Sequence, residues 1–292
     1  MKVLVVGASG QLGCELLHAV PEGYQVTGLS RDELDITDLE RVGTVVGQVA
    51  PDVLINAAAY TAVDQAESQV ERAFAVNAQG AGYLASVAAT RNIRLIHIST
   101  DFIFDGYNSQ PYETEAVAHP LNVYGASKWQ GEQRIAATEK LSYVIVRTSW
   151  VYSEYGQNFV KTILRLLQQR DQLGIVIDQI GSPTWAAGLA RGIWRITGKD
   201  ALPSILHWSD EGVASWYDFA VAIQEEALLL GLLSEPKPIK AIKSVEYPLP
   251  ARRPHYSVLD KSETWRHLDC RASHWRAALR QMLMRVEKNQ HG

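Results

Sequence analysis

Residues 2–13 read KVLVVGASGQLG, an apolar run that ends in glycines at positions 7, 10 and 13. A continuous apolar run is typical of a strand buried on both faces, and apolar positions with helical spacing follow it. Glycine lets the backbone turn tightly and approach a pyrophosphate, whose charge the N–H groups of the following helix bind. The spacing has one residue more than the usual dinucleotide fingerprint, and a tight turn without a ligand is the alternative. We expect a dinucleotide-binding loop that includes Gly7 and Gly10.

The alternation of strand and helix continues through the first half of the chain. Strand-like apolar runs recur at residues 24–30, 52–58, 93–100 and 142–149. Repeated strand–helix units predict right-handed crossovers and an α/β fold with a doubly wound parallel sheet, the Rossmann architecture.

The alternation fades after about residue 200, where tryptophan, proline and paired basic residues become more frequent. We therefore expect a dinucleotide-binding Rossmann domain over residues 1–200. A smaller, mostly α substrate-binding domain is expected over residues 201–292, and part of 148–156 is expected to contribute to the substrate site.

The composition excludes several classes of protein. The 292 residues are 47% hydrophobic, and a net charge of −4 without any block of Lys and Arg argues against nucleic acid as a partner. Cys14 and Cys270 are too few for a disulfide framework and suit a reducing compartment. Because no signal peptide or apolar run of about 18 residues occurs, we expect a cytoplasmic protein with no membrane partner. No zinc-ligand spacing or G-x-S-x-G motif occurs, so we expect neither a metal site nor a hydrolase.

The end of the second predicted strand favours a particular cofactor. An acid at this point would accept the ribose 2′-OH of NAD, whereas Ser30 and Arg31 offer donors to a 2′-phosphate. We therefore expect NADPH, with NADH possible, and we expect Asp35 and Ile36 to contact the adenine. The alternative for Arg31 is a solvated loop cation.

The third and fourth predicted strands end in residues suited to a flat ligand and a carbonyl. A run of small residues leads to Ala59, Tyr60 and Thr61, where the backbone can pass close to a cofactor. Thr100 and Asp101 follow the fourth strand, at the carboxyl edge where doubly wound folds bind ligands. His97, within that strand, is expected to be a core histidine with satisfied hydrogen bonds.

Tyr124 and Lys128 stand at positions i and i+4 of a predicted helix and therefore share one face. An ammonium one turn away favours the phenolate, so we expect the pKa of Tyr124 to fall below its free value of about 10. Tyr124 would then exchange a proton near neutral pH, Lys128 would hold the cofactor ribose, and Thr100 would polarise a carbonyl. An ordinary helix start with an unrelated Tyr and Lys is the alternative.

The motifs GASGQLG, LDITD, AAAYTAVD, STDFIFDG, NVYGASKWQGE, RTSWVY, IGSPT and RRPHYSVLD, in this order along nearly the whole chain, resemble the extended short-chain dehydrogenase/reductases. The resemblance implies NADPH-dependent reduction of the C4 ketone of a nucleotide sugar, dTDP-4-dehydro-L-rhamnose. It implies catalysis by Thr100, Tyr124 and Lys128, and sugar-nucleotide contacts from Thr100, Asp101 and Trp150. The cofactor would be lined by Gly10, Gln11, Leu12, Asp35, Ile36, Ala59, Tyr60 and Thr61.

Several positions qualify this resemblance. Phe102 stands where the family commonly has Tyr, and Arg147 and residues 252–254 are weaker candidates for phosphate contacts. Some relatives dimerise through magnesium; Glu15 matches one ligand position, but Ala187 stands at another, and the register of Glu287 is uncertain. We therefore expect a monomer or a metal-independent dimer. A non-catalytic NADP-binding module, like the regulatory subunit of methionine adenosyltransferase, is the alternative function.

Overall fold

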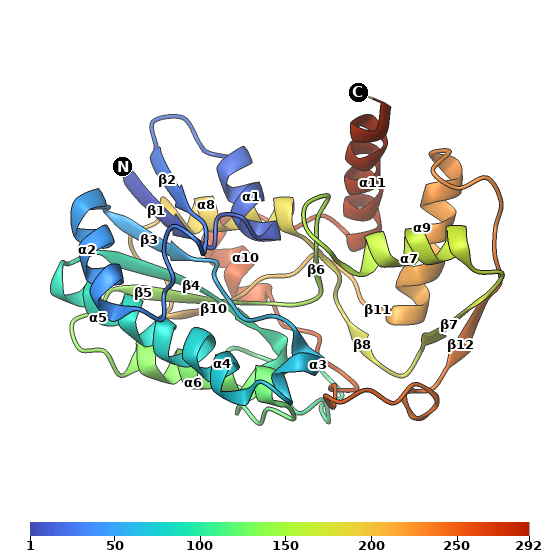
Figure 1. The fold of residues 1–292 in the computed structure, drawn as a ribbon, viewed down its shortest axis with the longest axis horizontal. Coiled ribbons are helices and arrows are strands. Elements are labelled where there is room, and N and C mark those ends of the chain that lie inside the picture. Colours follow the sequence, from blue (N-terminus) through green and yellow to red (C-terminus); the bar gives the residue numbers. More distant parts are fainter. Residues whose placement is uncertain (292) are drawn as a thin grey trace.

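The computed structural model describes residues 1–291, and their side chains as far as residue 287. A parallel sheet of six strands forms the larger part of this described chain, in the order β10-β5-β4-β3-β1-β2 (Figure 1). The predicted doubly wound sheet is therefore confirmed. Its strands are β1 (Lys2–Val6), β2 (Gln25–Leu29), β3 (Val53–Asn56), β4 (Arg94–Thr100), β5 (Tyr143–Thr148) and β10 (Ile205–His207).

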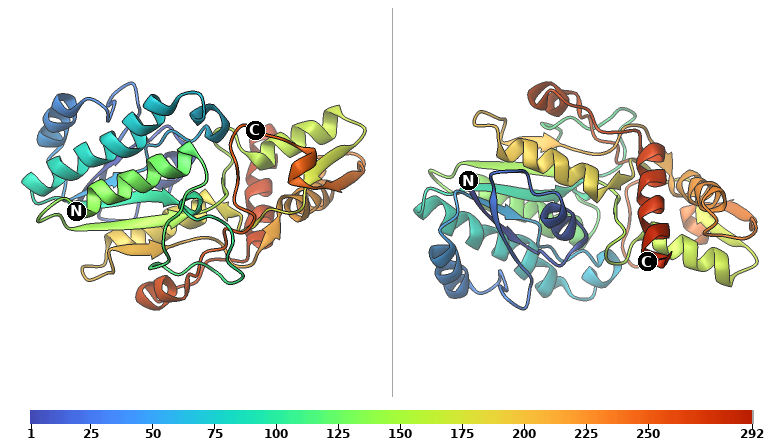
Figure 2. Two further views of the ribbon diagram at one scale, coloured as in Figure 1. Left: turned by 90° about the horizontal axis from the view of Figure 1, so that it is seen from below. Right: turned by 90° about the horizontal axis from the view of Figure 1, so that it is seen from above.

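Helices cover both faces of this sheet, as the two views of Figure 2 show. On β1, Val3 and Val5 face one helical layer while Leu4 and Val6 face the other, because successive side chains of a strand alternate. The first layer contains α1 (Gln11–His18), α8 (Ala186–Thr197) and α10 (Ser262–Leu268). The second layer contains α2 (Leu39–Val49), α5 (Ala81–Thr90) and α6 (Val123–Ala136).

A smaller, mostly helical part lies beside the carboxyl ends of the strands (Figure 1). Its own core packs aromatic and aliphatic side chains such as Phe219, Ile223 and Leu279, all buried. It is built from β6 (Val151–Tyr152), α7 (Phe159–Gln169), β7 (Leu173–Val176), β8 (Ile180–Gly181), β9 (Thr184–Trp185), β11 (Ala214–Ser215), α9 (Trp216–Leu229), β12 (Ile239–Ile242) and α11 (Trp275–His291). The short elements α3 (Val63–Ala66), α4 (Val70–Phe74), η1 (Ala75–Gly80), η2 (Asp101–Ile103) and η3 (Ser244–Glu246) complete the chain.

The chain passes more than once between these two parts. Strand β10 lies beyond residue 200 and yet pairs with β5 in the main sheet. Helix α7 and strand β7 lie before residue 200, and they pack with α9 and β12 in the smaller part. The division into two domains at residue 200 therefore remains a prediction. Elements from each side of residue 200 pack in the part that was assigned to the other side. Across the described residues, no helix combines the length and the apolar character that crossing a bilayer requires.

Candidate active site

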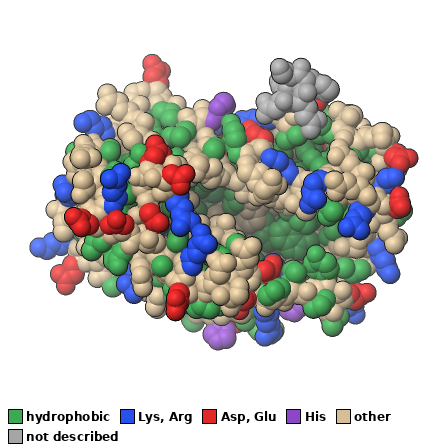
Figure 3. Space-filling model, viewed as in Figure 1, with side chains coloured by type: hydrophobic (Ala, Val, Ile, Leu, Met, Phe, Trp, Pro, Cys, Tyr) green, Lys and Arg blue, Asp and Glu red, His purple; other side chains and the backbone are tan. Residues whose placement is uncertain are grey.

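A cavity of about 630 Å³ lies between the sheet and the smaller part, and Figure 3 shows the hollow in this face of the molecule. Both parts contribute to its wall: the strand ends and α6 on one side, the segment after β5 and the start of α9 on the other. A smaller hollow of about 200 Å³ adjoins the glycine loop. Together the two hollows contact every residue predicted to take part in catalysis or in cofactor or sugar binding except Ser30; of the weaker phosphate candidates, only Arg253 lines them.

The glycine loop lies between the two hollows, because Gly10 lines both. Gly7 has a φ of +79°, and a Cβ placed on it would lie 2.5 Å from the backbone nitrogen of Ala58. Only glycine fits there, so the loop must turn tightly against the end of β3. The first residues of α1, Gln11 and Leu12, line the larger cavity.

The segment after β2 forms the far wall of the smaller hollow through Arg31, Asp35 and Ile36. Arg31 lies 3.7 Å from the Asp35 carboxylate, and its side chain is 60% exposed. Both donors of Ser30, its N–H and its hydroxyl, go to the Glu33 carboxylate at 2.7 Å. The expectation that Ser30 offers free donors to a phosphate is therefore wrong for this structure, because Glu33 accepts both.

The loop after β3 is held by a residue that the sequence reasoning missed. Asn77 accepts from the backbone N–H of Tyr60 at 2.8 Å and donates to its carbonyl at 3.0 Å. The same amide donates to Ser127 on α6 at 2.9 Å, so one buried side chain joins the loop to the helix that carries Tyr124. Asn77 lies in a π-helical turn, η1, and an isolated Asn in an apolar helical run was its only sequence signal.

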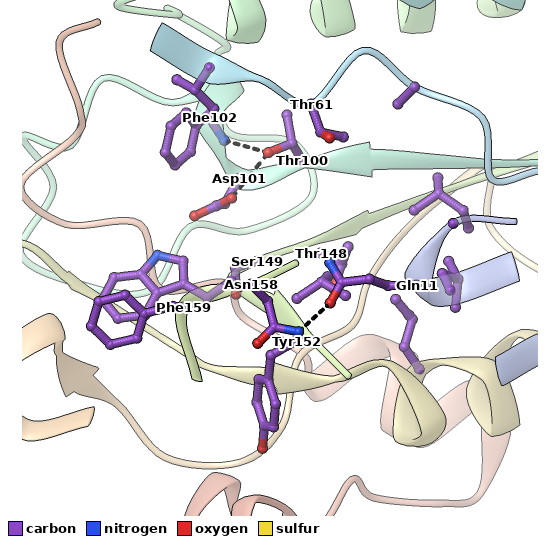
Figure 4. Close-up of a pocket in the computed structure, with 18 of the residues that line it drawn as sticks. Gln11, Thr61, Thr100, Asp101, Phe102, Thr148, Ser149, Tyr152, Asn158 and Phe159 are labelled. Atoms are coloured by element: carbon purple, nitrogen blue, oxygen red, sulfur yellow. Dashed lines mark hydrogen bonds between the residues drawn. The ribbon is translucent and has the colours of Figure 1, made fainter. Parts of the chain in front are cut away.

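Thr100 and Asp101 lie side by side at the end of β4 and face the cavity (Figure 4). The Thr100 hydroxyl donates to Asp101 Oδ1 at 3.1 Å and accepts from the backbone N–H of Phe102 at 3.2 Å. Asp101 Oδ2 is buried and has no hydrogen-bond partner among the described residues. Burial raises the pKa of Asp101 to about 7, against the lowering effect of the neighbouring Ser257 and Thr100 hydroxyls.

Tyr124 and Lys128 project from the first two turns of α6 and both line the cavity. Burial raises the pKa of Tyr124 to about 12, whereas the Thr100 hydroxyl acts in the opposite direction. Burial also lowers the pKa of Lys128 to about 8. The expectation that Lys128 lowers the pKa of Tyr124 is therefore wrong for the unliganded chain, because both groups are desolvated. Tyr124 carries its proton at neutral pH, which is the state that a proton donor needs.

His97 is buried and both of its ring nitrogens have partners, as expected of a core histidine. Nδ1 lies 3.0 Å from the Asn56 amide nitrogen, and Nε2 lies 3.2 Å from Lys128 Nζ. The second contact connects this core residue directly to the candidate catalytic lysine.

The basic residues suggested for phosphate contacts have different surroundings. Arg147 is buried and forms an ion pair of 2.8 Å with Glu132, so its proposed phosphate contact is wrong: it faces the core. Arg253 lines the cavity, where the Asp64 carboxylate accepts from both of its terminal nitrogens, at 3.0 and 2.7 Å. Arg252 donates to the Tyr107 hydroxyl outside the cavity lining.

Aromatic residues of the smaller part close the other end of the cavity. The rings of Trp150 and Trp216 stack with centroids 3.5 Å apart, and Phe159 packs on Trp216. The Asn158 side chain donates to Gln11 Oε1 at 2.9 Å, which joins the smaller part to the glycine-loop helix (Figure 4). Trp216, Phe159 and Asn158 were not predicted, because nothing local in the sequence places them near the glycine loop.

The fold and this cavity define a class, a Rossmann-type reductase with a Tyr–Lys pair beside a dinucleotide loop. The family model described as "RmlD substrate binding domain" matches residues 1–288, and the chain belongs to this family. The resemblance drawn from the motifs is thereby confirmed.

Relatives and solved structures match this chain along nearly its whole length. The dTDP-4-dehydrorhamnose reductase of Aggregatibacter actinomycetemcomitans is 42% identical over 286 residues, 96% of this chain and 97% of the relative. The enzyme of the same name from Burkholderia thailandensis is 40% identical over 291 residues, with 96% and 97% covered. A crystal structure of dTDP-4-dehydrorhamnose reductase from Bacillus anthracis in complex with NADP has a TM-score of 0.91 and 35% identity, covering 97% of this chain and 99% of that one.

Proposed function

We propose that this protein reduces the C4 ketone of dTDP-4-dehydro-L-rhamnose with NADPH and forms dTDP-L-rhamnose. One observation carries the proposal: a protonated, half-buried Tyr124 lines the same cavity as Thr100, Lys128 and the dinucleotide loop. The names of the relatives and the NADP complex of the Bacillus anthracis enzyme support it.

The residues around the two hollows fit a dinucleotide. A side chain at Gly7 would strike Ala58, so the loop turns tightly into α1, and the backbone N–H groups in the first turn of a helix bind negative charge such as a pyrophosphate. The smaller hollow suits the adenosine, with Ile36 and Asp35 beside the base. The remaining proposed cofactor contacts are Gly10, Gln11, Leu12, Arg31, Ala59, Tyr60, Thr61 and the ribose contact of Lys128.

NADPH supplies the hydride for the C4 carbon, and the chain's own residues supply orientation and the proton. Tyr124 donates its phenolic proton to the ketone oxygen as the C–H bond forms. The Thr100 hydroxyl donates to the same oxygen and polarises the carbonyl, while Lys128 stabilises the resulting phenolate by its charge. Asp101, partly protonated near neutral pH, can donate to or accept from a sugar hydroxyl through its unpartnered Oδ2. Trp150 forms an apolar wall for the sugar.

The test is oxidation of NADPH, followed by its absorbance, with dTDP-4-dehydro-L-rhamnose as substrate and product identification by chromatography. We expect turnover to dTDP-L-rhamnose. Tight NADPH binding without turnover on this or other nucleotide 4-keto sugars would overturn the reductase and favour the regulatory module. Turnover only with another nucleotide or another sugar would retain the reaction class and correct the substrate.

A further inference from the structure

A chain of hydrogen bonds with a fixed direction runs through the core to Lys128. The backbone N–H of Ala58 can only donate, and it donates to Asn56 Oδ1 at 3.1 Å. This turns the Asn56 amide nitrogen toward His97 Nδ1, 3.0 Å away, so Nδ1 accepts. In a neutral imidazole the proton then lies on Nε2, and Nε2 faces Lys128 Nζ at 3.2 Å.

The direction of this chain disfavours the charge of Lys128. An ammonium has three N–H donors and no lone pair, so it meets the His97 N–H as donor against donor. A neutral amine accepts that N–H and still donates to the carbonyl of Ile98, at 2.6 Å. His97 and Lys128 are each only 1% exposed, so bulk water does not relieve the conflict. Burial also lowers the pKa of His97 well below its ordinary value, which keeps the ring neutral.

We propose that His97 is a positioning residue whose Nε2–H faces the Lys128 amine and lowers the pH at which Lys128 loses its charge beside Tyr124. This inference rests on the proposed function, in which the Lys128 ammonium stabilises the Tyr124 phenolate after the phenolic proton moves to the ketone oxygen. An ammonium that loses its proton near neutral pH also returns a proton to the phenolate more readily than an ordinary lysine, whose pKa is about 10.4.

Few other charges face Lys128 from the elements that pack on α6. Glu132, one turn further on the same helix, raises the pKa of Lys128, and this opposes the effect of burial. On η2, Asp101 lies beside Tyr124 and raises the pKa of its phenol. Helix α5 carries no charged residue, and η1 presents the uncharged Asn77 amide. Of the charged residues on α3, α4 and the turn between them, Asp64 binds Arg253, and Glu71 and Arg72 are exposed. Glu67 accepts from the backbone N–H of Val123 at the start of α6 and so faces the end of the helix that carries Tyr124.

Three substitutions separate this role from simple packing. His97→Leu removes the N–H that opposes the ammonium, so the pKa of Lys128 rises. The alkaline limb of the pH–kcat profile should therefore move up by about one pH unit. Asn56→Asp reverses the chain, because a carboxylate accepts from Ala58 and from His97 Nδ1–H and leaves Nε2 as an acceptor for the ammonium. This limb should move up at least as far. In His97→Gln, Oε1 accepts from Asn56 and Nε2 donates to Lys128, so the limb should stay near the wild-type position.

The profiles are measured at saturating NADPH and nucleotide sugar, from about pH 6 to about pH 10, with circular dichroism as the check on folding. An unmoved limb in folded His97→Leu and Asn56→Asp overturns the proposal. A shift in His97→Gln equal to that in His97→Leu overturns it too, because packing alone would then explain both. The dissociation constant of NADPH, measured by its fluorescence over the same pH range, depends on the ribose contact of Lys128. The pH at which NADPH binding weakens should move up in His97→Leu and Asn56→Asp and stay near the wild-type value in His97→Gln. This binding measurement tests the role of His97 even if the wild-type protein shows no turnover and the proposed function fails.

Discussion

Arg285 on α11 lies 3.3 Å from the Glu15 carboxylate on α1, an ion pair between residues 270 positions apart in the chain. The same guanidinium lies 2.8 Å from Glu154, and the Ser153 hydroxyl donates to Glu15 at 2.9 Å. The acid that matches a magnesium position of some relatives thus already has a guanidinium partner, which it shares with Glu154, and burial together with Glu154 raises the pKa of Glu15 to about 7.

We therefore predict that chelation changes neither activity nor size in solution. At the second matching position Ala187 is buried in the apolar core. No group of three or more potential metal ligands occurs among the described residues, and a hard divalent cation needs several oxygen ligands. Light scattering and turnover with and without EDTA are the measurements. A dimer that dissociates with EDTA and reforms with magnesium would refute the prediction.

Replacing Tyr124 by Phe should lower kcat by about two to four orders of magnitude, the usual effect of losing a positioned general acid. NADPH binding should change little, because the edge-on contact between the rings of Tyr124 and Phe102, 5.7 Å apart, survives the loss of the hydroxyl. Steady-state kinetics and NADPH fluorescence measure the two effects. Tyr83→Phe on α5, outside the cavity lining, is the control. Turnover like that of the wild type would show that Tyr124 is not the proton donor.

Asp101→Asn should stabilise the fold at about pH 8 and have no such effect at about pH 4. Burial raises the pKa of Asp101 from 3.8 to about 7, above its unfolded value. Its favourable contribution is complete below about pH 4, is lost as the pH rises to about 7, and then stays constant. Removing the charge should therefore add on the order of a few kcal/mol to the free energy of unfolding at the higher pH.

Urea denaturation at both pH values measures this difference, with Asp32→Asn in the exposed loop after β2 as the control. An equal gain at the two pH values would show that the carboxylate is not the cause. Activity should fall in Asp101→Asn in any case, since the residue is a proposed substrate contact.

The preference for NADPH over NADH should be modest. Arg31 is the cation that lines the smaller hollow, where we propose that the adenosine binds, whereas Glu33 accepts both donors of Ser30 and places a negative charge close to them. Arg31→Ala should abolish the preference, and Glu33→Gln should increase it several-fold by removing like-charge repulsion. The ratio of kcat/KM for the two cofactors is the measurement. Equal values for the wild type, or no change in either variant, would contradict this account.

Trp216→Ala should raise KM for the nucleotide sugar several-fold and leave KM for NADPH unchanged. Trp216 stacks on Trp150 at the end of the cavity far from the smaller hollow, and such an aromatic pair contributes about 0.5–1.5 kcal/mol beyond its buried area. Tyr217→Ala, on the next residue of α9 and outside the cavity lining, controls for damage to the helix. An equal increase in both KM values would show that the tryptophan pair supports the whole cavity and does not act on the sugar alone.

The sequence by itself determined the sheet, the dinucleotide loop and the Tyr–Lys pair. These features depend on short-range patterns: continuous apolar runs, glycines at fixed spacing, and two residues one helical turn apart. Even the limits of β4, Arg94–Thr100, nearly coincide with the apolar run from 93 to 100, because burial on both faces allows few polar positions there.

Only the tertiary structure decided the electrostatics and the far wall of the site. Spacing suggested that Lys128 would acidify Tyr124, but burial of both side chains changes the sign, and desolvation depends on the whole surrounding fold. Trp216 reaches the cavity, and Arg285 reaches the helix that follows the glycine loop, from positions far along the chain. His97 was correctly expected to be buried, but its contact with Lys128 arises where a strand and a helix pack together, and no local pattern records that packing.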